Sequence, residues 1–222
     1  MPITVCPRAA VFDLDGTVVD NMALHAEAFA VFATRHGLPA LTPADRAKLD
    51  GRRNSEIFPV LFGRDMASDE WQAYEHEKEG LYRDLSRGRI TLVAGLPALL
   101  ERCAALEITV ALATSAPELN VAHTLSEAGL PAAFPIIVRG DQVPRGKPAP
   151  DVFIEASRQL QVPVDGCVVF EDAPMGIVAA KAAGMRVVAV TTSFSAAQFA
   201  AMETPPDLAC SDFAAFLALA RW

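Results

Sequence analysis

Short apolar runs alternate with segments of helical periodicity along most of the chain. The first run, at residues 9–14, ends in acidic side chains, and further runs follow from about residue 90 onward. Short, wholly apolar runs are typical of strands buried on both faces, and helices between such strands form parallel crossovers. The pattern predicts an α/β fold with a doubly wound parallel sheet. Strands are expected at residues 9–14, 108–114, 135–138, 167–172 and 186–191, and helices at 96–106, 117–128, 151–161 and 174–183.

Residues 20–88 carry a different pattern. Apolar positions recur there at helical spacing, strand-like runs are absent, and charged residues are frequent. Gly37 is placed to end the first helix of this region. Further helical stretches are expected at residues 43–49, 54–62 and 69–86. We therefore expect a small helical insert between the first strand and the rest of the sheet.

The composition is that of a folded globular protein. The chain has 222 residues, of which 52% are hydrophobic and 21% charged, with a net charge of −8. This length suits one core domain with a modest insert, and the lack of a basic stripe argues against nucleic acid as a partner. No apolar run approaches the ~20 residues of a membrane-spanning helix, and the first residues lack a signal-peptide apolar segment. We expect a cytoplasmic protein that acts without a membrane.

Four polar segments follow the predicted strands. Because the carboxyl ends of parallel strands meet at one edge of the sheet, side chains from these segments are expected to gather in one ligand site. The segments are DLDGT at residues 13–17, Thr114-Ser115, Lys147 in the sequence RGKPAPDVF, and Glu171-Asp172.

The acidic residues of these segments suit phosphoryl transfer. A fixed carboxylate such as that of Asp13 can attack phosphorus and form an acyl-phosphate. Two anions repel each other, and Asp13 with Glu171 and Asp172 supplies the hard oxygen ligands that Mg²⁺ prefers. Asp15 stands two residues from Asp13. It can protonate the leaving oxygen and then deprotonate water.

The remaining residues suit the binding of a phosphoryl group. Thr114, Ser115 and Lys147 can hold its oxygens, and Lys147 adds positive charge where the transition state spreads negative charge. Gly16 allows the backbone to turn sharply beside the nucleophile. A helix cap by Thr114 and Ser115 is compatible with this role, because helix N-termini attract anions.

Four sequence segments together resemble the haloacid dehalogenase superfamily. They are VFDLDGT, ATS, GKPAPDVF and VVFEDAPMGIVAAKAAGM, in this order along the chain. The helical insert between the first two resembles that of subfamily I, and within it the likeness is to β-phosphoglucomutase-like phosphatases. The resemblance implies a Rossmann-like core over residues 1–19 and 90–222, with an inserted four-helix cap domain over residues 20–89.

The resemblance also implies a role for each residue of the motifs. Asp13 would be the nucleophile and Asp15 the general acid and base. Mg²⁺ would be held by Asp13, the main-chain carbonyl of Asp15 and Asp172, while Glu171 would either bind it directly or support its ligands. Thr114 and Lys147 would bind the phosphate.

The insert adds less specific candidates. His25 lies ten residues after Asp15, and the family often has a histidine there that meets the substrate or the acid/base; a half-buried structural role is the alternative. Arg52, together with Arg53 and Asn54, is a candidate for holding the far end of the substrate, against a solvated surface role. Lys78 is interpreted as part of a solvated helix face, with a cap lysine that faces the substrate as the alternative.

Two features distinguish this chain from the mutase and dehalogenase branches of the superfamily. The mutases have a Lys-Gly pair followed by an arginine, whereas Asp50-Gly51 and Asn54 stand here. Asp15 weighs against a dehalogenase, because a halide leaving group needs no protonation. We expect a Mg²⁺-dependent phosphatase for a small phosphomonoester such as a sugar phosphate, acting as a monomer or weak dimer. Phosphoglucomutase activity, inorganic pyrophosphatase activity and a non-catalytic binding protein remain the alternatives.

Overall fold

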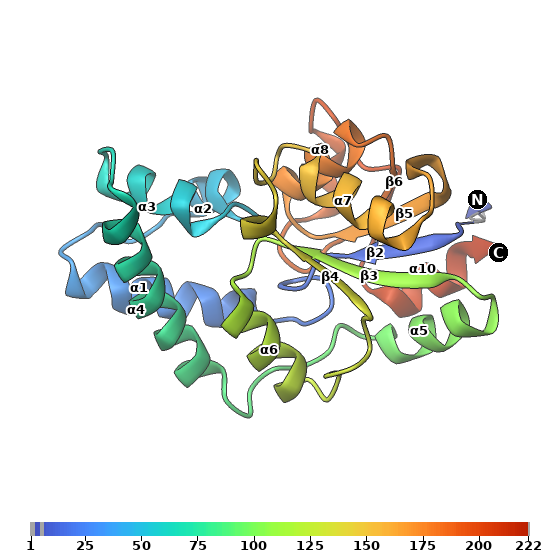
Figure 1. The fold of residues 1–222 in the computed structure, drawn as a ribbon, viewed down its shortest axis with the longest axis horizontal. Helices are drawn as coiled ribbons and strands as arrows, with labels where there is room; N and C mark the ends of the chain where they lie inside the picture. Colours follow the sequence, from blue (N-terminus) through green and yellow to red (C-terminus); the bar gives the residue numbers. More distant parts are fainter. Residues whose placement is uncertain (1–2, 5–6, 222) are drawn as a thin grey trace.

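A parallel β-sheet forms the centre of the molecule. The structure is a computed structural model that describes residues 3–4 and 7–221. Within these residues the main sheet has six strands in the order β4-β3-β2-β5-β6-β7, all parallel (Figure 1). The strands are β2 (Ala9–Phe12), β3 (Thr109–Thr114), β4 (Ile136–Arg139), β5 (Cys167–Glu171), β6 (Arg186–Val190) and β7 (Leu208–Cys210). A separate short pair joins β1 (Ile3–Thr4) to β8 (Ala220–Arg221).

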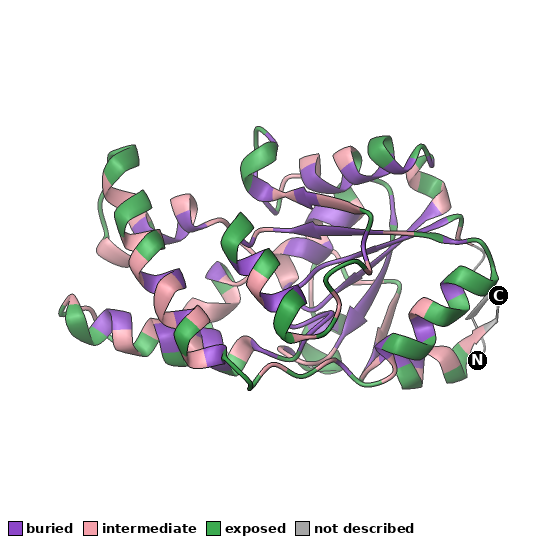
Figure 2. Ribbon diagram, turned by 60° about the horizontal axis from the view of Figure 1, so that its bottom comes forward, coloured by how far each residue is buried: buried purple, intermediate pink, exposed green. Residues whose placement is uncertain are grey.

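Helices cover both faces of this sheet. Apolar residues of α5, α6 and α10 pack on one face, and those of α7, α8 and α9 pack on the other. Figure 2 shows buried residues along the strands and exposed residues on the outer sides of the helices. The predicted doubly wound α/β fold is therefore confirmed. The helices are α5 (Leu96–Ala105), α6 (Glu118–Glu127), α7 (Asp151–Leu160), α8 (Pro174–Ala182), α9 (Ala196–Ala200) and α10 (Phe213–Leu219), with short 3₁₀ turns at Gly140–Gln142 and Val164–Gly166.

The alternation of side chains along the strands explains the two-sided core. In β2, Phe12 belongs to the cluster under α5 and α10, while its neighbour Val11 belongs to the cluster under α7 and α8. Phe12 stacks on Phe170 of β5 with ring centroids 4.9 Å apart, and Phe213 of α10 meets both rings edge to face. Such aromatic packing fixes the central strands whose ends carry the polar residues.

Four helices fill the chain between β2 and α5. In Figure 1 they lie beyond the carboxyl ends of β2 and β3. Phe32 of the first helix packs against Phe58, Phe62 and Tyr74, and Tyr82 of the fourth is fully buried. The helical character predicted for this region is confirmed, whereas its boundaries as a domain stay a prediction. The helices are α1 (Met22–Arg35), α2 (Pro43–Leu49), α3 (Asn54–Phe62) and α4 (Ser68–Ser86).

Two further findings complete the fold. No helix among the described residues is both long and apolar enough to cross a bilayer. Strand β2 ends at Phe12 rather than at residue 14, so that Asp13 opens the following loop. The elements after residue 191, namely α9, β7, α10 and β8, were not predicted from the apolar pattern.

The aromatic contacts of α10 predict how much stability the protein loses when Phe213 is truncated. Phe213→Ala removes a fully buried ring that touches two strand residues, and we expect it to lower the free energy of unfolding by about 3–5 kcal/mol. Leu219→Ala, on the same helix but 39% exposed, is the matched control and should cost about 1 kcal/mol or less. Urea denaturation measures both, and equal costs would contradict the packing described here.

Candidate active site

The loop after β2 brings the first motif to the edge of the sheet. The amide of Asp13 donates to the carbonyl of Phe170 at 3.0 Å, which continues the register of β2 with β5. The chain then turns, and the amide of Gly16 donates to the carbonyl of Val19 at 2.8 Å. Gly16 has a φ of +78°, and a Cβ at this position would lie 2.0 Å from Asp172 Oδ2. A side chain here would therefore force the loop away from β5.

Three carboxylates and one ammonium group gather where these strands end. One oxygen each of Asp13, Glu171 and Asp172 lies within 4.8 Å of the others, and all three residues are buried. Lys147, which is 1% exposed, donates to Asp13 Oδ1 at 2.6 Å and to Glu171 Oε1 at 2.7 Å. The predicted convergence of Asp13, Lys147, Glu171 and Asp172 in one site is thus present in the structure.

Neighbouring groups hold each carboxylate of this cluster in place. The hydroxyl of Thr17 donates to Asp172 Oδ1 at 3.1 Å, and that of Ser193 donates to Asp172 Oδ2. Glu171 Oε2 accepts a hydrogen bond from the amide of Ala173 at 2.7 Å. Gly176 on α8 leaves the space that the Glu171 carboxyl occupies, since a Cβ there would lie 1.6 Å from Oε1. The cluster is therefore built into the ends of β2 and β5 and the start of α8.

The electrostatics of the cluster favour a bound cation. Burial raises the pKa of Asp13 to about 8, with Lys147 lowering it and Glu171 raising it further. Burial, and then the charges of Glu171 and Asp13, raise the pKa of Asp172 well above its ordinary value. Burial lowers the pKa of Lys147, but Asp13 and Glu171 raise it more, so the ammonium stays charged. One positive charge does not balance three carboxylates, and a divalent ion with hard oxygen ligands fits the remainder.

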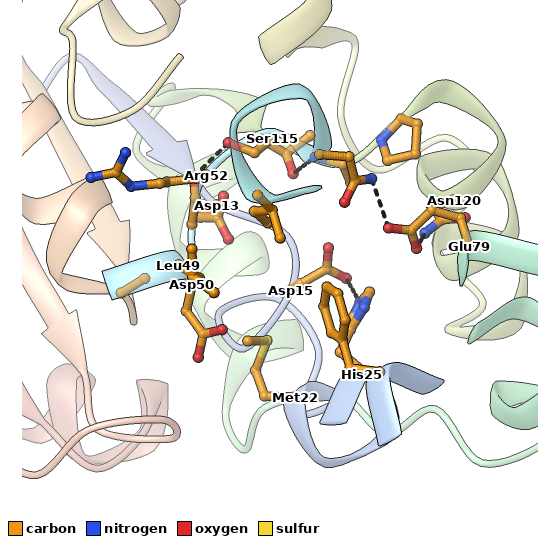
Figure 3. Close-up of a pocket in the computed structure, with 18 of the residues that line it drawn as sticks. Asp13, Asp15, Met22, His25, Leu49, Asp50, Arg52, Glu79, Ser115 and Asn120 are labelled. Atoms are coloured by element: carbon orange, nitrogen blue, oxygen red, sulfur yellow. Dashed lines mark hydrogen bonds and ion pairs between the residues drawn. The ribbon is translucent and has the colours of Figure 1, made fainter. Parts of the chain in front are cut away.

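Asp15 lies on the other side of the loop and has its own partners. The side-chain amide of Asn21 donates to Asp15 Oδ1 at 2.6 Å, and His25 Nε2 lies 3.5 Å from the same oxygen. Lys78 Nζ lies 3.0 Å from His25 Nδ1. An ammonium group only donates, so Nδ1 accepts and the ring proton of neutral His25 is on Nε2, facing Asp15. Figure 3 shows Asp15 and His25 side by side in the pocket.

These partners set the charge of Asp15. Burial by itself raises the pKa of Asp15, but the interaction with His25 and the hydrogen bond of Asn21 lower it more, to below the ordinary value. The carboxylate is therefore ionised at neutral pH and able to accept a proton. His25 also stacks on Tyr82 at 3.8 Å between ring centroids, which fixes the plane of the imidazole.

The segment after β3 forms a further side of the site. Thr114 Oγ1 accepts a hydrogen bond from the amide of Ala116 at 3.0 Å. The hydroxyl of Ser115 donates to the carbonyl of Gly51 at 2.6 Å and so joins the core to the helical insert. Both residues line the cavity. Their predicted role in phosphate binding stays a prediction.

A cavity of about 80 Å³ lies between the sheet and the helical insert. It brings together most of the residues that the sequence marked, while Gly16, Lys147 and Glu171 lie behind its wall. The predicted site residues that line it are Asp13, Asp15, His25, Arg52, Asn54, Thr114, Ser115 and Asp172.

The arginines of the insert differ in their surroundings. Arg53 donates to the carbonyl of Gly140 at 3.2 Å and to Glu56, so it ties the insert to the core. Arg52 Nη2 lies 3.8 Å from Met175 Sδ, and in Figure 3 its guanidinium points away from Asp15. Neither arginine is a solvated surface group, and a substrate contact by Arg52 stays a prediction.

The comparisons with known proteins agree with this geometry. The family model described as haloacid dehalogenase-like hydrolase matches residues 10–190. The chain belongs to this family. The hydrolase is 31% identical to the phosphorylated carbohydrates phosphatase of Thermotoga maritima, over 80% of this chain and 82% of that one. It is 34% identical to hexitol phosphatase A of Escherichia coli, over 82% of either chain.

A solved structure supports the same assignment. A family IA hydrolase of Entamoeba histolytica superimposes with a TM-score of 0.83 at 29% identity, covering 93% of each chain. The family named from the four motifs is therefore confirmed, as is the enzyme class of a phosphoric monoester hydrolase.

Several residues of the hydrolase site were missed in the sequence. Lys78 is 2% exposed and lines the cavity, so its interpretation as a solvated helix face is wrong. Helix α4 turns this face toward α1, where the Lys78 ammonium lies 4.2 Å from the Phe29 ring centroid. Asn21, Glu79 and Asn120 were not singled out. A Lys-Glu pair inside a helix is ordinary on a surface, and only the folded structure identifies it as buried.

The close approach of Glu171 to Gly176 predicts that Gly176→Ala destabilises the protein, whereas a control glycine-to-alanine change in another helix stabilises it. Gly176→Ala would overlap the Glu171 carboxyl, and we expect it to destabilise the hydrolase by about 1–3 kcal/mol. Gly80→Ala, in helix α4 with only a side-chain atom at 3.9 Å, should instead stabilise it by about 0.5–1 kcal/mol. Thermal denaturation compares the two. A neutral Gly176→Ala would mean that Glu171 is not confined by α8.

Proposed function

We propose that this hydrolase is a Mg²⁺-dependent phosphatase that cleaves a small phosphorylated carbohydrate through an aspartyl-phosphate on Asp13. The observation that carries the proposal is the buried group of Asp13, Glu171, Asp172 and Lys147, of which Asp13 and Asp172 line a cavity that also contains Asp15. A nucleophilic carboxylate, a set of metal ligands and an acid/base therefore stand within reach of one bound phosphate.

Asp13 is the nucleophile of the proposed reaction. A carboxylate oxygen of Asp13 forms a bond to phosphorus while the bond from phosphorus to the ester oxygen breaks. Lys147, hydrogen-bonded to Oδ1, orients this carboxylate and adds positive charge beside the transferred group. Thr114 and Ser115, at the end of β3, bind the phosphoryl oxygens.

Asp15 transfers the protons. It donates a proton to the leaving ester oxygen and then removes one from the water that attacks the phosphorus of the aspartyl-phosphate. A bound phosphate dianion favours the protonated form of Asp15 in the first step, because like charges raise the pKa of a carboxyl group. Asn21 and His25 keep the side chain directed into the cavity. In this role His25 is a positioning residue for Asp15.

The acidic cluster suits one divalent ion. Asp13, Glu171 and Asp172 would hold Mg²⁺, together with the main-chain carbonyl of Asp15 that the family resemblance implies. When bound there, the ion supplies positive charge that offsets the carboxylates and the phosphate. The raised pKa values of Asp13 and Asp172, caused first by burial and then by neighbouring carboxylates, are consistent with this assignment, because a bound cation would favour the ionised forms of both groups.

The substrate class follows from the relatives and from the size of the cavity. The two curated relatives are named for phosphorylated carbohydrates and for hexitol phosphate. A cavity of about 80 Å³ suits a small molecule. Residues 20–89 are proposed to act as a cap that closes over the bound substrate and excludes water. The contacts of Ser115 with Gly51 and of Arg53 with Gly140 would hold the insert against the core in the closed position.

Capture of the phosphoenzyme tests this function. Wild-type protein with Mg²⁺ and a sugar phosphate should gain one phosphoryl group in acid-quenched samples, and should release inorganic phosphate. In Asp13→Asn both should fall by about 10³-fold or more, because the amide is not a nucleophile, while circular dichroism stays unchanged. Mass spectrometry of peptides identifies the modified residue. Phosphate release that survives in Asp13→Asn, or a label on another residue, would contradict the proposal.

A further inference from the structure

Charged and polar residues of the helical insert that phosphate chemistry does not require line the cavity beyond Asp15 and His25. We call this lining the cap wall. Its residues come from α2, the start of α3 and the middle of α4, and all of them line the cavity. They are Arg46, Asp50, Asn54, Lys78 and Glu79.

The first charged pair of the cap wall is Arg46 with Asp50. Arg46 Nε and Nη2 both donate to Asp50 Oδ2, at 3.2 and 3.1 Å, across one turn at the end of α2. The third nitrogen, Nη1, is buried and has no hydrogen-bond partner among the described residues. The pair therefore neutralises its own charge and leaves both N–H groups of Nη1 unused.

The second pair is Lys78 with Glu79. Glu79 is 4% exposed, and its Oε1 accepts from Lys78 at 3.0 Å and from Asn54 at 2.8 Å. Its Oε2 accepts from Asn120 at 2.6 Å. Each carboxylate oxygen has two lone-pair sites, so Oε2 keeps one acceptor position. Figure 3 shows Glu79 beside Asn120, across the cavity from Asp50.

These pairs decide which groups the cap wall can receive. Each of its cations already bonds a carboxylate, so an incoming anion would have to displace Asp50 or Glu79, or lie beside them. A hydroxyl group meets no such cost, since it can donate to Glu79 Oε2 without displacing either ion pair. Arg52 is the remaining cation of the insert that lines the cavity. It follows Gly51, whose carbonyl bonds Ser115, and so belongs to the phosphate end.

We propose that the cap wall restricts the substrate to phosphomonoesters whose far end carries neutral hydroxyl groups, with Asp50 and Glu79 as the specificity-determining residues that reject a second anionic group. This inference rests on the proposed phosphatase function and narrows it. It disfavours pyrophosphate and sugar bisphosphates as substrates of this hydrolase.

Two substrates that differ at one carbon test the proposal. Glucitol 6-phosphate and 6-phosphogluconate have the same length, but the far end is a hydroxymethyl group in the first and a carboxylate in the second. We expect wild-type protein to favour glucitol 6-phosphate in kcat/KM by about tenfold or more, the effect of one partly screened charge. Asp50→Asn and Glu79→Gln should each reduce that ratio by about threefold to tenfold. Glu70→Gln, which alters an exposed ion pair of α4 outside the cavity, is the matched control and should leave it unchanged.

Binding separates this inference from the proposed function. Calorimetry with the Asp13→Asn protein and Mg²⁺ gives the ratio of the two dissociation constants without turnover, and it should show the same preference. A wild-type ratio near one, or a ratio that neither cap-wall variant lowers, would overturn the inference even if both sugars are hydrolysed. If wild-type protein with Mg²⁺ does not hydrolyse p-nitrophenyl phosphate, the proposed phosphatase function is contradicted. The ratio of the two dissociation constants would still decide whether the cap wall rejects a second anionic group.

Discussion

The mutual repulsion of Asp13, Glu171 and Asp172 at the ends of two neighbouring strands is the constraint on which the rest of the site depends. Buried carboxylates are held this closely only if positive charge and hydrogen-bond donors surround them. Lys147, Thr17 and Ser193 supply part of this compensation, and the cluster fits a divalent ion for the remainder. The stacked Phe12 and Phe170 rings beneath it help to hold the two strands together.

The sequence predicted those elements and site residues that depend on a short stretch of the chain. Apolar runs located five of the six strands of the main sheet, and residues next to those runs converged as the parallel topology requires. The elements after residue 191 escaped prediction because they are short: α9 has five residues and β7 three. Their identity depends on contacts such as that of Phe213 with Phe12, which join residues distant in the chain.

The insert was harder to interpret than the core, because charge on a helix does not reveal its direction. Lys78 looked like a surface residue, yet α4 packs on α1 and buries it beside His25 and Glu79. The substitution of Asp50 for a lysine was visible in the sequence, whereas its pairing with Arg46 required the folded α2. The catalytic residues can thus be predicted from the sequence at the strand ends. The residues proposed to select the substrate become apparent only from the packing of the helices above them.

Binding of Mg²⁺ to the resting protein tests the central claim most directly. The account predicts that millimolar Mg²⁺ raises the melting temperature of the wild-type protein, since a ligand that binds only the folded state stabilises it. In Asp172→Asn this increase should be lost, while the melting temperature without metal should be equal or higher, because the substitution replaces a buried carboxyl group of raised pKa with a neutral amide. An unchanged wild-type melting temperature in Mg²⁺, or the same increase in Asp172→Asn, would contradict the account.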